Sequence, residues 1–280
     1  MFSKEIDLVE TVIRPRSGWQ LFDIKAIWEY RELFYIFAWR DLKVRYRQTL
    51  LGILWVILQP LTSMTIFTVL FGRYAKIPSG DLPYALFVLI GLVFWNFFSN
   101  AVTSANESLL AHENIIKKVY FPKVILPLAA VVTSFVDFCI NTLLIIAFSF
   151  ILGYPPHWQF VIVFPLCVLI TCATVSGLGL FLSSMNVKYR DVRYLIPHFI
   201  QILFFFTPVI YPLSIVSSVN RFILALNPLS TVIELLRTAF TGGNFPFIHL
   251  LFVSGISTLL VCILGVWHFA RTERFFADIL

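Results

Sequence analysis

Six stretches of the chain are each long and apolar enough to cross a lipid bilayer, and they constrain the fold more than any other feature. A helix needs about 20 mostly apolar residues to cross the hydrocarbon core. The stretches that qualify are 51–72, 84–106, 124–152, 159–184, 195–213 and 247–270. Only 13% of all residues are charged, against about 25% in soluble proteins, so a soluble fold cannot cover so much apolar surface. The sequence therefore predicts an all-α integral membrane protein with six transmembrane helices.

The basic residues predict how these helices are oriented. Seventeen of the 21 Lys and Arg residues lie in 1–50, 107–123, 185–194 and 271–280, and four lie in the alternate connections. Because basic segments stay on the cytoplasmic side, we expect both termini in the cytoplasm. This divides the chain into a cytoplasmic N-terminal segment at 1–50, a transmembrane domain at 51–270 and a cytoplasmic tail at 271–280. The net charge of +6 thus orients the chain, and we predict no nucleic-acid partner.

Residues 26–47 follow a helical pattern but carry too much charge to cross the membrane. Two apolar stripes flank a charged strip that contains Arg40 and Lys43. The stripes consist of Trp28, Tyr35, Trp39, Leu42 and Tyr46, and of Tyr30, Leu33, Phe34, Phe37 and Val44. We predict an amphipathic interfacial helix with one stripe on lipid, the other on the protein, and the charged strip toward water or a soluble partner. A membrane-surface anchor without a partner remains an alternative.

A proline divides the apolar segment 214–246, which lies between the fifth and sixth spans. The dipeptide Asn227-Pro228 leaves two pieces that are each too short to cross. Asn227 as N-cap, Pro228 at the first helical position and Gly242 after the end predict a helix over 228–241. Broken backbone is tolerated at membrane depth only where protein or water surrounds it, so we predict a re-entrant helical hairpin.

Three ionisable side chains within the apolar segments are interpreted as structural. Asp137 lies near the centre of the third span, where an ionisable group suggests function by default. A proton pathway would contain several such groups, so we favour a buried, hydrogen-bonded Asp137. Glu234 and Arg237 are three residues apart on the short helix and are expected to neutralise each other.

Polar and aromatic side chains cluster on faces of the spans. The first span carries Gly52, Trp55, Gln59, Thr62 and Ser63 within about 100° of the helical wheel. The second and third spans carry Asn96, Ser99, Asn100, Thr103 and Glu107, and Thr133, Ser134, Asp137 and Asn141. Such faces are typical either of helix contacts or of a polar conduit. The fifth span carries Phe204, Phe205 and Phe206, followed by Tyr211; such rings suit sugar stacking, lipid contact or interface anchoring.

No motif for chemistry occurs in the sequence. It contains no GxxxxGK[ST], HExxH or GxSxG pattern, its five His residues are scattered, and its four Cys residues lie in apolar runs. We predict no catalytic residue, no metal site and no cofactor in this chain. Energy for uphill transport must therefore come from an ion gradient or from another subunit.

Seven short segments, taken in order, resemble a known family. They are 13–19 (IRPRSGW), 39–49 (WRDLKVRYRQT), 51–60 (LGILW to Gln59-Pro60), 120–123 (YFPK), 189–192 (YRDV), 207–212 (TPVIYP) and Asn227-Pro228. The chain resembles polysaccharide-export ABC transporter permeases, the Wzm-type O-antigen exporters, with capsule and teichoic-acid permeases as relatives. The resemblance extends over nearly the whole chain.

This resemblance implies a homodimeric permease in the inner membrane of a bacterium, with two cytoplasmic ATP-binding-cassette ATPase subunits that hold ATP and Mg. The substrate would be a lipid-linked polysaccharide, in a channel lined mainly by the first and fifth spans. The candidate lining residues are Trp55, Gln59, Thr62, Ser63, Phe205 and Tyr211. Phe205 is chosen from three consecutive phenylalanines, because the helical wheel does not show which of them faces the channel. The candidate ATPase contacts are Arg40, Lys43, Glu113, Lys117 and Lys118. The last three lie in a short helix within the loop 107–123, for which a solvated turn is the alternative interpretation.

Two other classes of function are alternatives. An ion-coupled secondary transporter or channel would need internal repeats and more buried charge, and neither is visible in the sequence. A membrane-bound glycosyltransferase would need pairs of acidic residues at the membrane surface, where this chain carries mostly Lys and Arg.

Overall fold

The computed structural model describes residues 28–47, 52–245 and 247–276, and every regular element in these ranges is a helix. The α-helices are α2 (Arg31–Arg47), α3 (Leu54–Phe67), α4 (Tyr84–Ala111), α5 (Glu113–Ile116), α6 (Ile125–Ile151), α7 (Phe160–Lys188), α8 (Val192–Phe206), α9 (Ser218–Ala225), α10 (Pro228–Thr241) and α11 (Ile248–Thr272). A π-helix, η1 (Thr68–Tyr74), continues α3, and two 3-10 turns are η2 (Leu213–Ile215) and η3 (Glu273–Phe275). The predicted all-helical class is confirmed. The motif at 13–19 and the last four residues of the tail, 277–280, lie outside the described residues.

Five helical segments are long and apolar enough to cross a membrane. They are Leu54–Tyr74, Tyr84–Ala111, Ile125–Ile151, Phe160–Lys188 and Ile248–Phe275. They coincide, apart from a few residues at their ends, with the first, second, third, fourth and sixth predicted spans. The number of crossings becomes six if the bent pair of α9 and α10 counts as one span.

The fifth predicted span, 195–213, is shorter in the structure. Helix α8 has 15 residues, a length of about 22 Å, whereas the hydrocarbon core is about 30 Å thick. The helix ends because Thr207 takes an extended conformation with ψ 133°, as expected for a residue that precedes a proline. Beyond it, Thr207, Pro208 and Val209 are buried as non-helical backbone.

The break between α9 and α10 is confirmed. The two helices form an angle of 108° at Asn227, whose side chain accepts a hydrogen bond from the backbone N–H of Leu229 at 3.2 Å. Pro228 begins α10, and Gly242 ends it with φ 71°, a left-handed conformation that glycine adopts without steric cost. The bounds of α10 are those that the sequence predicted.

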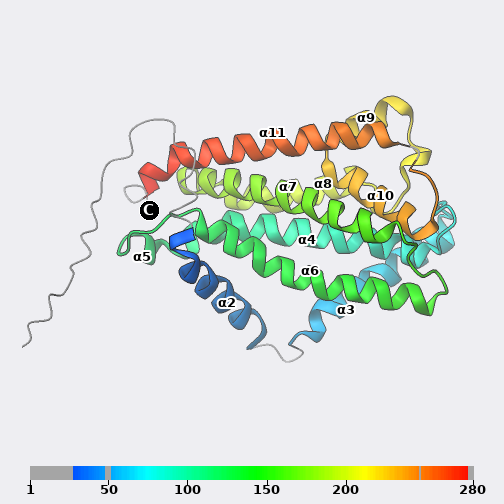
Figure 1. Ribbon diagram of the computed structural model, residues 1–280, viewed down its shortest axis with the longest axis horizontal. Coiled ribbons are helices and arrows are strands. Elements are labelled where there is room, and N and C mark those ends of the chain that lie inside the picture. Colours follow the sequence, from blue (N-terminus) through cyan, green and yellow to red (C-terminus); the bar gives the residue numbers. More distant parts are fainter. Residues whose placement is uncertain (1–27, 48–51, 246, 277–280) are drawn as a thin grey trace, which may run out of the picture.

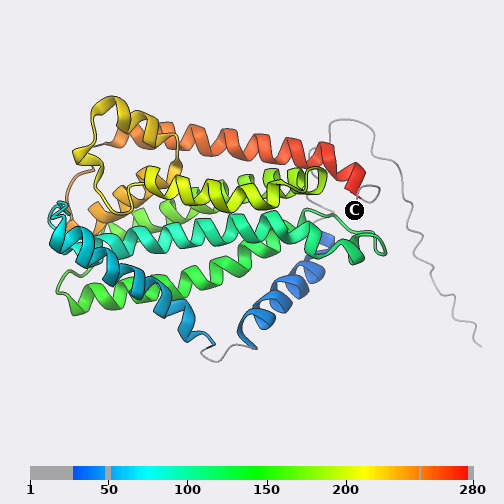
Figure 2. The same ribbon diagram turned by 180° about the vertical axis from the view of Figure 1, so that it is seen from behind.

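Helix α4 lies at the centre of the bundle, with α6, α7 and α11 running roughly alongside it (Figure 1). Of the apolar window of α4, 78% is buried, against 11% for α3. Helices α2 and α3 diverge as a V on one side of the bundle in both views (Figures 1 and 2). Most of the α3 surface is therefore left for lipid or for another protein chain.

Close helix contact between α7 and α11 depends on glycine. A Cβ atom on Gly177 would lie 2.8 Å from the Cα atom of Cys262, so no larger residue fits without separating the helices. The Sγ atom of Cys262 donates a hydrogen bond to the carbonyl of Ala173 at 3.1 Å. Small residues at such contacts let two membrane helices approach closely.

Helix α2 packs against the bundle through one of its two predicted apolar stripes. Phe37 and Ala38 are buried in a cluster that also contains Leu109, Ile116 and Phe121. On the opposite stripe, the large rings are exposed, namely Trp28 (70%), Tyr35 (64%) and Trp39 (56%). The predicted division into a protein-facing and an outward-facing stripe is confirmed for these residues. It fails near the end of α2, where Val44 of the protein-facing stripe is exposed and Leu42 and Tyr46 of the outward-facing stripe are half-buried.

Candidate functional site

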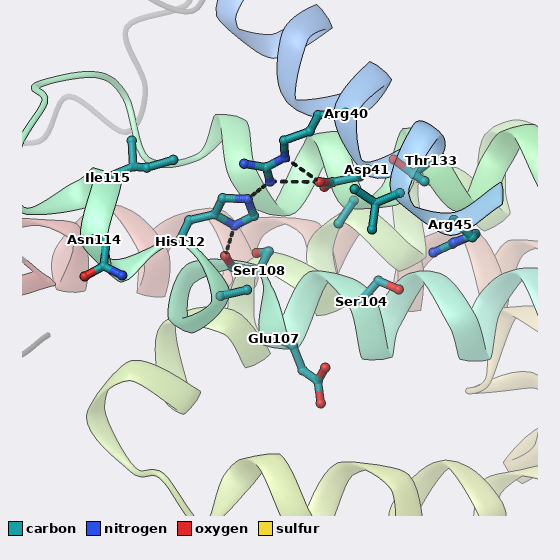
Figure 3. Close-up of a pocket in the computed structure, with 13 residues that line it drawn as sticks. Arg40, Asp41, Arg45, Ser104, Glu107, Ser108, His112, Asn114, Ile115 and Thr133 are labelled. Atoms are coloured by element: carbon teal, nitrogen blue, oxygen red, sulfur yellow. Dashed lines mark hydrogen bonds and ion pairs between the residues drawn. The ribbon is translucent and has the colours of Figure 1, made fainter. Parts of the chain in front are cut away.

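A groove of about 700 Å³ separates α2 from the end of α4 and the start of α5. Figure 3 shows Arg40 of α2 reaching across it toward His112, which follows the last residue of α4. Arg40 Nη2 also donates to Asp41 Oδ1 at 2.8 Å and contacts His112 Nε2. His112 Nδ1 lies 2.7 Å from the carbonyl oxygen of Ser108, so we assign the ring proton to Nδ1 and the acceptor to Nε2. Arg40 thus connects α2 to the corner between α4 and α5.

The structure places the predicted ATPase contacts at this same end of the bundle, with differing exposure. Arg40 is half-buried in the groove, whereas Lys43 is exposed on α2. On the α5 segment, Glu113 is half-buried, and Lys117 and Lys118 are exposed. Exposed charges beside a firmly packed helix form a surface that a soluble protein can contact. Sequence reasoning missed His112, whose contact with Arg40 spans 72 positions of the chain.

Asp137 of α6 binds the last turn of α2. It accepts a hydrogen bond from Arg45 Nη1 at 2.5 Å and another from the Tyr46 hydroxyl. Burial and the hydrogen bond to Asp137 raise the pKa of Tyr46, so its phenol keeps its proton and remains a donor. Sequence reasoning singled out Asp137 but missed both partners, which lie on a helix that does not cross the membrane.

A second pocket, of about 320 Å³, lies beside this ion pair, and we call it the α3–α4 pocket. Its polar and aromatic lining consists of Arg45 and Tyr46 from α2, Trp55 and Gln59 from α3, Asn100, Thr103 and Ser104 from α4, and Asp137 from α6. The groove under α2 and this pocket share Arg45 and Ser104 in their walls. The structure therefore brings two of the predicted lining residues together with the polar face of the second span.

The remaining predicted lining residues do not border that pocket. Thr62 is exposed and its hydroxyl donates to the carbonyl of Leu58 at 2.8 Å, while Ser63 is half-buried. Phe205 is 63% exposed, and Tyr211, half-buried, donates its hydroxyl to the Phe205 carbonyl at 3.2 Å. Neither the groove under α2 nor the α3–α4 pocket therefore includes these four side chains.

Among the three consecutive rings of α8, Phe204 faces the bundle. Its ring centroid lies 5.9 Å from that of Phe67 and 5.3 Å from that of Trp95. Phe205 and Phe206 are exposed at 63% and 59%. Phe205, chosen from the sequence, is thus one of the two outward rings.

Arg237 of α10 is buried and holds the broken backbone in place. Its Nη1 donates to the carbonyl of Pro208 at 2.8 Å and its Nη2 to that of Val209 at 2.7 Å. Its Nε also donates to the Phe87 carbonyl at 3.2 Å. The guanidinium therefore supplies donors to carbonyls that the end of α8 leaves without helical partners.

The predicted ion pair is also present, with Arg237 Nη1 at 3.3 Å from Glu234 Oε2. Sequence reasoning found this pair but missed the carbonyls. The signal for them was Thr207-Pro208, because a proline inside an apolar span leaves carbonyl groups that need a donor.

These features define a multi-span helical membrane protein with polar pockets between its helices and a basic corner at one end. The chain matches the ABC-2 type transporter family over residues 32–241. Because the match extends over most of the chain, the protein belongs to this family.

Known relatives agree with this assignment. The chain is 30% identical to the O-antigen export system permease protein RfbA of Myxococcus xanthus over 255 residues, which are 90% of this chain and 97% of the relative. It is 28% identical to a protein of the same name from Klebsiella pneumoniae over 251 residues, 89% of this chain and 95% of the relative. The polysialic acid transport protein KpsM of Escherichia coli is 23% identical over 212 residues, 73% of this chain and 79% of the relative.

Family membership confirms that the chain is the membrane subunit of an ABC transporter and works with an ATPase partner. It does not support the two alternative classes, an ion-coupled transporter and a glycosyltransferase.

Proposed function

We propose that the chain is the permease of an ATP-driven exporter of a lipid-linked, O-antigen-like polysaccharide. The observation that carries this proposal is the similarity to O-antigen export permeases along about 90% of the chain. Capsule polysaccharide is the second candidate, because the similarity to a polysialic acid transporter extends over 73% of the chain. We favour the O-antigen class since both the identity and the coverage are higher.

The proposed assembly is a homodimer with two cytoplasmic ATPase subunits, which bind ATP and Mg. The exposed surface of α3 supports it, since only 11% of its apolar window is buried within the subunit. Helix α8 presents a similar surface, with Phe199, Phe205 and Phe206 each more than half exposed. Two copies that meet along α3 and α8 would cover these faces.

The proposed location is the inner membrane of a bacterium, with both termini in the cytoplasm. The bias of basic residues supports this orientation, with 17 of 21 on the predicted inner side. The N-terminal segment 1–50, the transmembrane domain 51–270 and the tail 271–280 remain our division of the chain. The end of the bundle that carries α5 would then face the cytoplasm.

The proposed channel runs between two copies. Its wall would consist of Trp55, Gln59, Thr62, Ser63, Phe205 and Tyr211. A sliding polymer needs many weak contacts, and rings and hydroxyls supply them through stacking and exchangeable hydrogen bonds. Exposure of Trp55 (59%) and Phe205 (63%) in the single subunit is consistent with such a wall.

The proposed contact with the ATPase consists of Arg40, Lys43, Glu113, Lys117 and Lys118. Asp137, Glu234 and Arg237 act as structural polar groups in this proposal. Their ion pairs, to Arg45 and to each other, support that role.

Two measurements test the proposed function. The purified chain alone should hydrolyse no ATP, whereas the complex with its ATPase subunit should do so, because the chain lacks a phosphate-binding loop. Deleting the gene should leave lipid-linked glycan on the inner leaflet, and restoring it should return glycan to the cell surface. Normal surface glycan in the deletion strain would disprove the proposal.

A further inference from the structure

The α3–α4 pocket contains polar side chains without protein partners. Gln59 and Asn100, which are exposed in the single subunit, and Thr103 and Ser104, which are half-buried, line it. In the part of the chain that the structure describes, none of these four side chains forms a hydrogen bond. Other hydroxyls in the bundle behave differently: Thr133 donates to the Ala129 carbonyl at 3.0 Å. A polar group at membrane depth is costly to leave unpaired. The pocket therefore offers amides and hydroxyls to something that is not part of the subunit.

The charges around this pocket are already balanced. Arg45 and Asp137 both belong to its wall and pair with each other. Each carboxylate oxygen of Asp137 accepts one hydrogen bond, from Arg45 and Tyr46, and keeps a further lone pair. A phosphate would need an unpaired cation, which this wall does not present among the described residues. The chemistry thus suits a neutral ligand that carries many hydroxyl groups.

The pocket also contains an aromatic surface. Trp55 lies in its wall and is 59% exposed, so its ring is free to stack. Sugar rings combine an apolar CH face with hydroxyls around the edge, which match an indole beside amides and hydroxyls. The volume of about 320 Å³ is at the lower end of the usual range for small-ligand sites, about 300 to 1,000 Å³. It has room for a sugar unit rather than for a folded chain.

We propose that the α3–α4 pocket is a sugar-binding site within each subunit, which holds one unit of the glycan on the α2 side of the bundle. This inference rests on the proposed function, because it takes its ligand class from polysaccharide export. The site shares Trp55 and Gln59 with the wall of the proposed channel between two copies. It differs from that channel because α2, α4 and α6 build most of the rest of its wall, and α8 contributes no residue to it. The adjoining groove under α2, which shares Arg45 and Ser104 with the pocket, connects it to the α5 corner.

Site-specific photo-crosslinking in the intact complex tests the proposal. A photoreactive phenylalanine derivative replaces Val56, an apolar residue of the pocket wall, in complexes whose ATPase subunit carries a hydrolysis-blocking substitution. The same derivative replaces Phe205 to report on the proposed channel, and Val161, which is 73% exposed on α7, to report on lipid. We expect glycan adducts at position 56 in cells that make the glycan, and none in cells whose glycan synthesis is deleted.

Paired substitutions provide a quantitative comparison. Asn100→Leu with Thr103→Val removes the polar groups of α4 from the pocket and should lower adduct formation at position 56 about tenfold, as the loss of two neutral hydrogen bonds predicts. The matched control is Asn220→Leu with Thr142→Val, which removes one amide and one hydroxyl elsewhere. Thr142 donates to its own helix at the Phe138 carbonyl. The control should leave the adducts unchanged.

The outcomes separate this proposal from the function on which it rests. Glycan adducts at position 205 but none at position 56 would overturn the pocket and leave export intact. Equal adduct formation in the pocket variant and in its control would overturn it as well. No adduct at either position, together with normal surface glycan in the deletion strain, would refute the function itself. If the double variant fails to fold, Ser104→Ala and the unsubstituted complex still give the decisive comparison at position 56.

Discussion

Arg237 joins three segments of the chain that are distant in sequence. It donates to carbonyls at Phe87, Pro208 and Val209 and pairs with Glu234. The side chain is only 5% exposed, and a buried charge is tolerated when it is paired and its donors are used. This one residue thus makes a non-helical stretch possible inside a membrane bundle.

Replacing Arg237 should destabilise the whole subunit. Arg237→Leu leaves buried carbonyls without a donor and Glu234 without a partner, which we expect to cost about 3 to 5 kcal/mol. Thermal unfolding of the purified protein in detergent should show a clearly lower Tm and a poor yield. Glu234→Gln, which keeps an acceptor for Arg237, serves as control and should have a smaller effect. A Tm unchanged in Arg237→Leu would contradict the assigned role.

Asp137 fastens α2 to α6 through Arg45 and Tyr46. The pairing joins residues that are 92 and 91 positions apart, and the Asp137 side chain is 14% exposed. Hydrogen bonds to charged groups contribute about 1.5 to 3 kcal/mol each. We infer that Asp137 decides how firmly the end of α2 is held.

Asp137→Leu should therefore release the end of α2 without unfolding the bundle. Amide hydrogen exchange of residues 40–47 should rise at least tenfold, while exchange in α4 and α7 stays as it is. The exchanged pair Asp137→Arg with Arg45→Asp should recover part of the protection, because it restores attraction between the two positions. Equal protection of α2 in Asp137→Leu and in the original protein would rule out this function of the pair.

The sequence revealed these charged residues but not all of their partners. Glu234 and Arg237 are three positions apart, so helical periodicity alone brings them together. Arg45 and Asp137 belong to different helices, and no local rule relates their positions. Their contact depends on how α2 crosses α6, which is decided by packing of the whole bundle.

At the level of helices, the α5 segment and the charged strip of α2 form one surface at one end of the bundle. Ile116 of α5 and Phe37 of α2 are buried in the same apolar cluster, and this cluster holds the two helices together. Lys117 and Lys118 follow α5 directly and are exposed. Force applied to either helix by a bound ATPase would therefore reach the other through this cluster.

Charge reversal on this surface should weaken ATPase binding. Lys117→Glu with Lys118→Glu should reduce co-purification of the ATPase about tenfold, because attraction across the interface becomes repulsion. Membrane insertion and Tm should not change, since both side chains are exposed. The matched control is Arg73→Glu with Lys76→Glu, two exposed basic residues that follow α3 at the opposite end. A complex of normal yield in the first variant, at low salt as well as at 150 mM, would count against the assignment.

Local signals predicted some helices closely and others poorly. Both ends of α10 were predicted correctly from Asn227, Pro228 and Gly242, because capping residues act on the backbone next to them. The end of α8 was missed because apolar composition continues past Thr207, while the helix stops at the residue before Pro208. The π-helix at Thr68–Tyr74 has no sequence signal that hydropathy could detect.

At the level of the whole molecule, the subunit leaves its α3 and α8 faces open. Trp55 on α3 and Phe205 on α8 are both more than half exposed. In the proposed dimer these rings line the channel together with Tyr211. The sequence predicted which spans carry such rings, whereas their separation onto outward faces depends on the assembled bundle.

Removing the three rings together should stall export. Stacking contributes about 1 kcal/mol per ring, so one Ala substitution should slow export a few-fold, and Ala at Trp55, Phe205 and Tyr211 together about a hundredfold. Surface glycan, measured over time after induction, gives the rate. The control carries Ala at Phe150, Trp158 and Phe252, which are exposed elsewhere. Equal loss in both triple variants would show that export depends on aromatic content rather than on a channel wall.

The central position of α4 also has a consequence for how the protein is made. During synthesis α4 emerges from the ribosome before α6, α7 and α10, the helices that later surround it. Its 28 residues include a single charged side chain, Glu107, so it is stable in lipid on its own while its neighbours are still being translated. Assembly then exchanges lipid for protein around a helix that already spans the bilayer, driven by fit rather than by escape from water. A chain truncated after residue 123 should accordingly resist alkaline extraction from membranes as well as the full chain does.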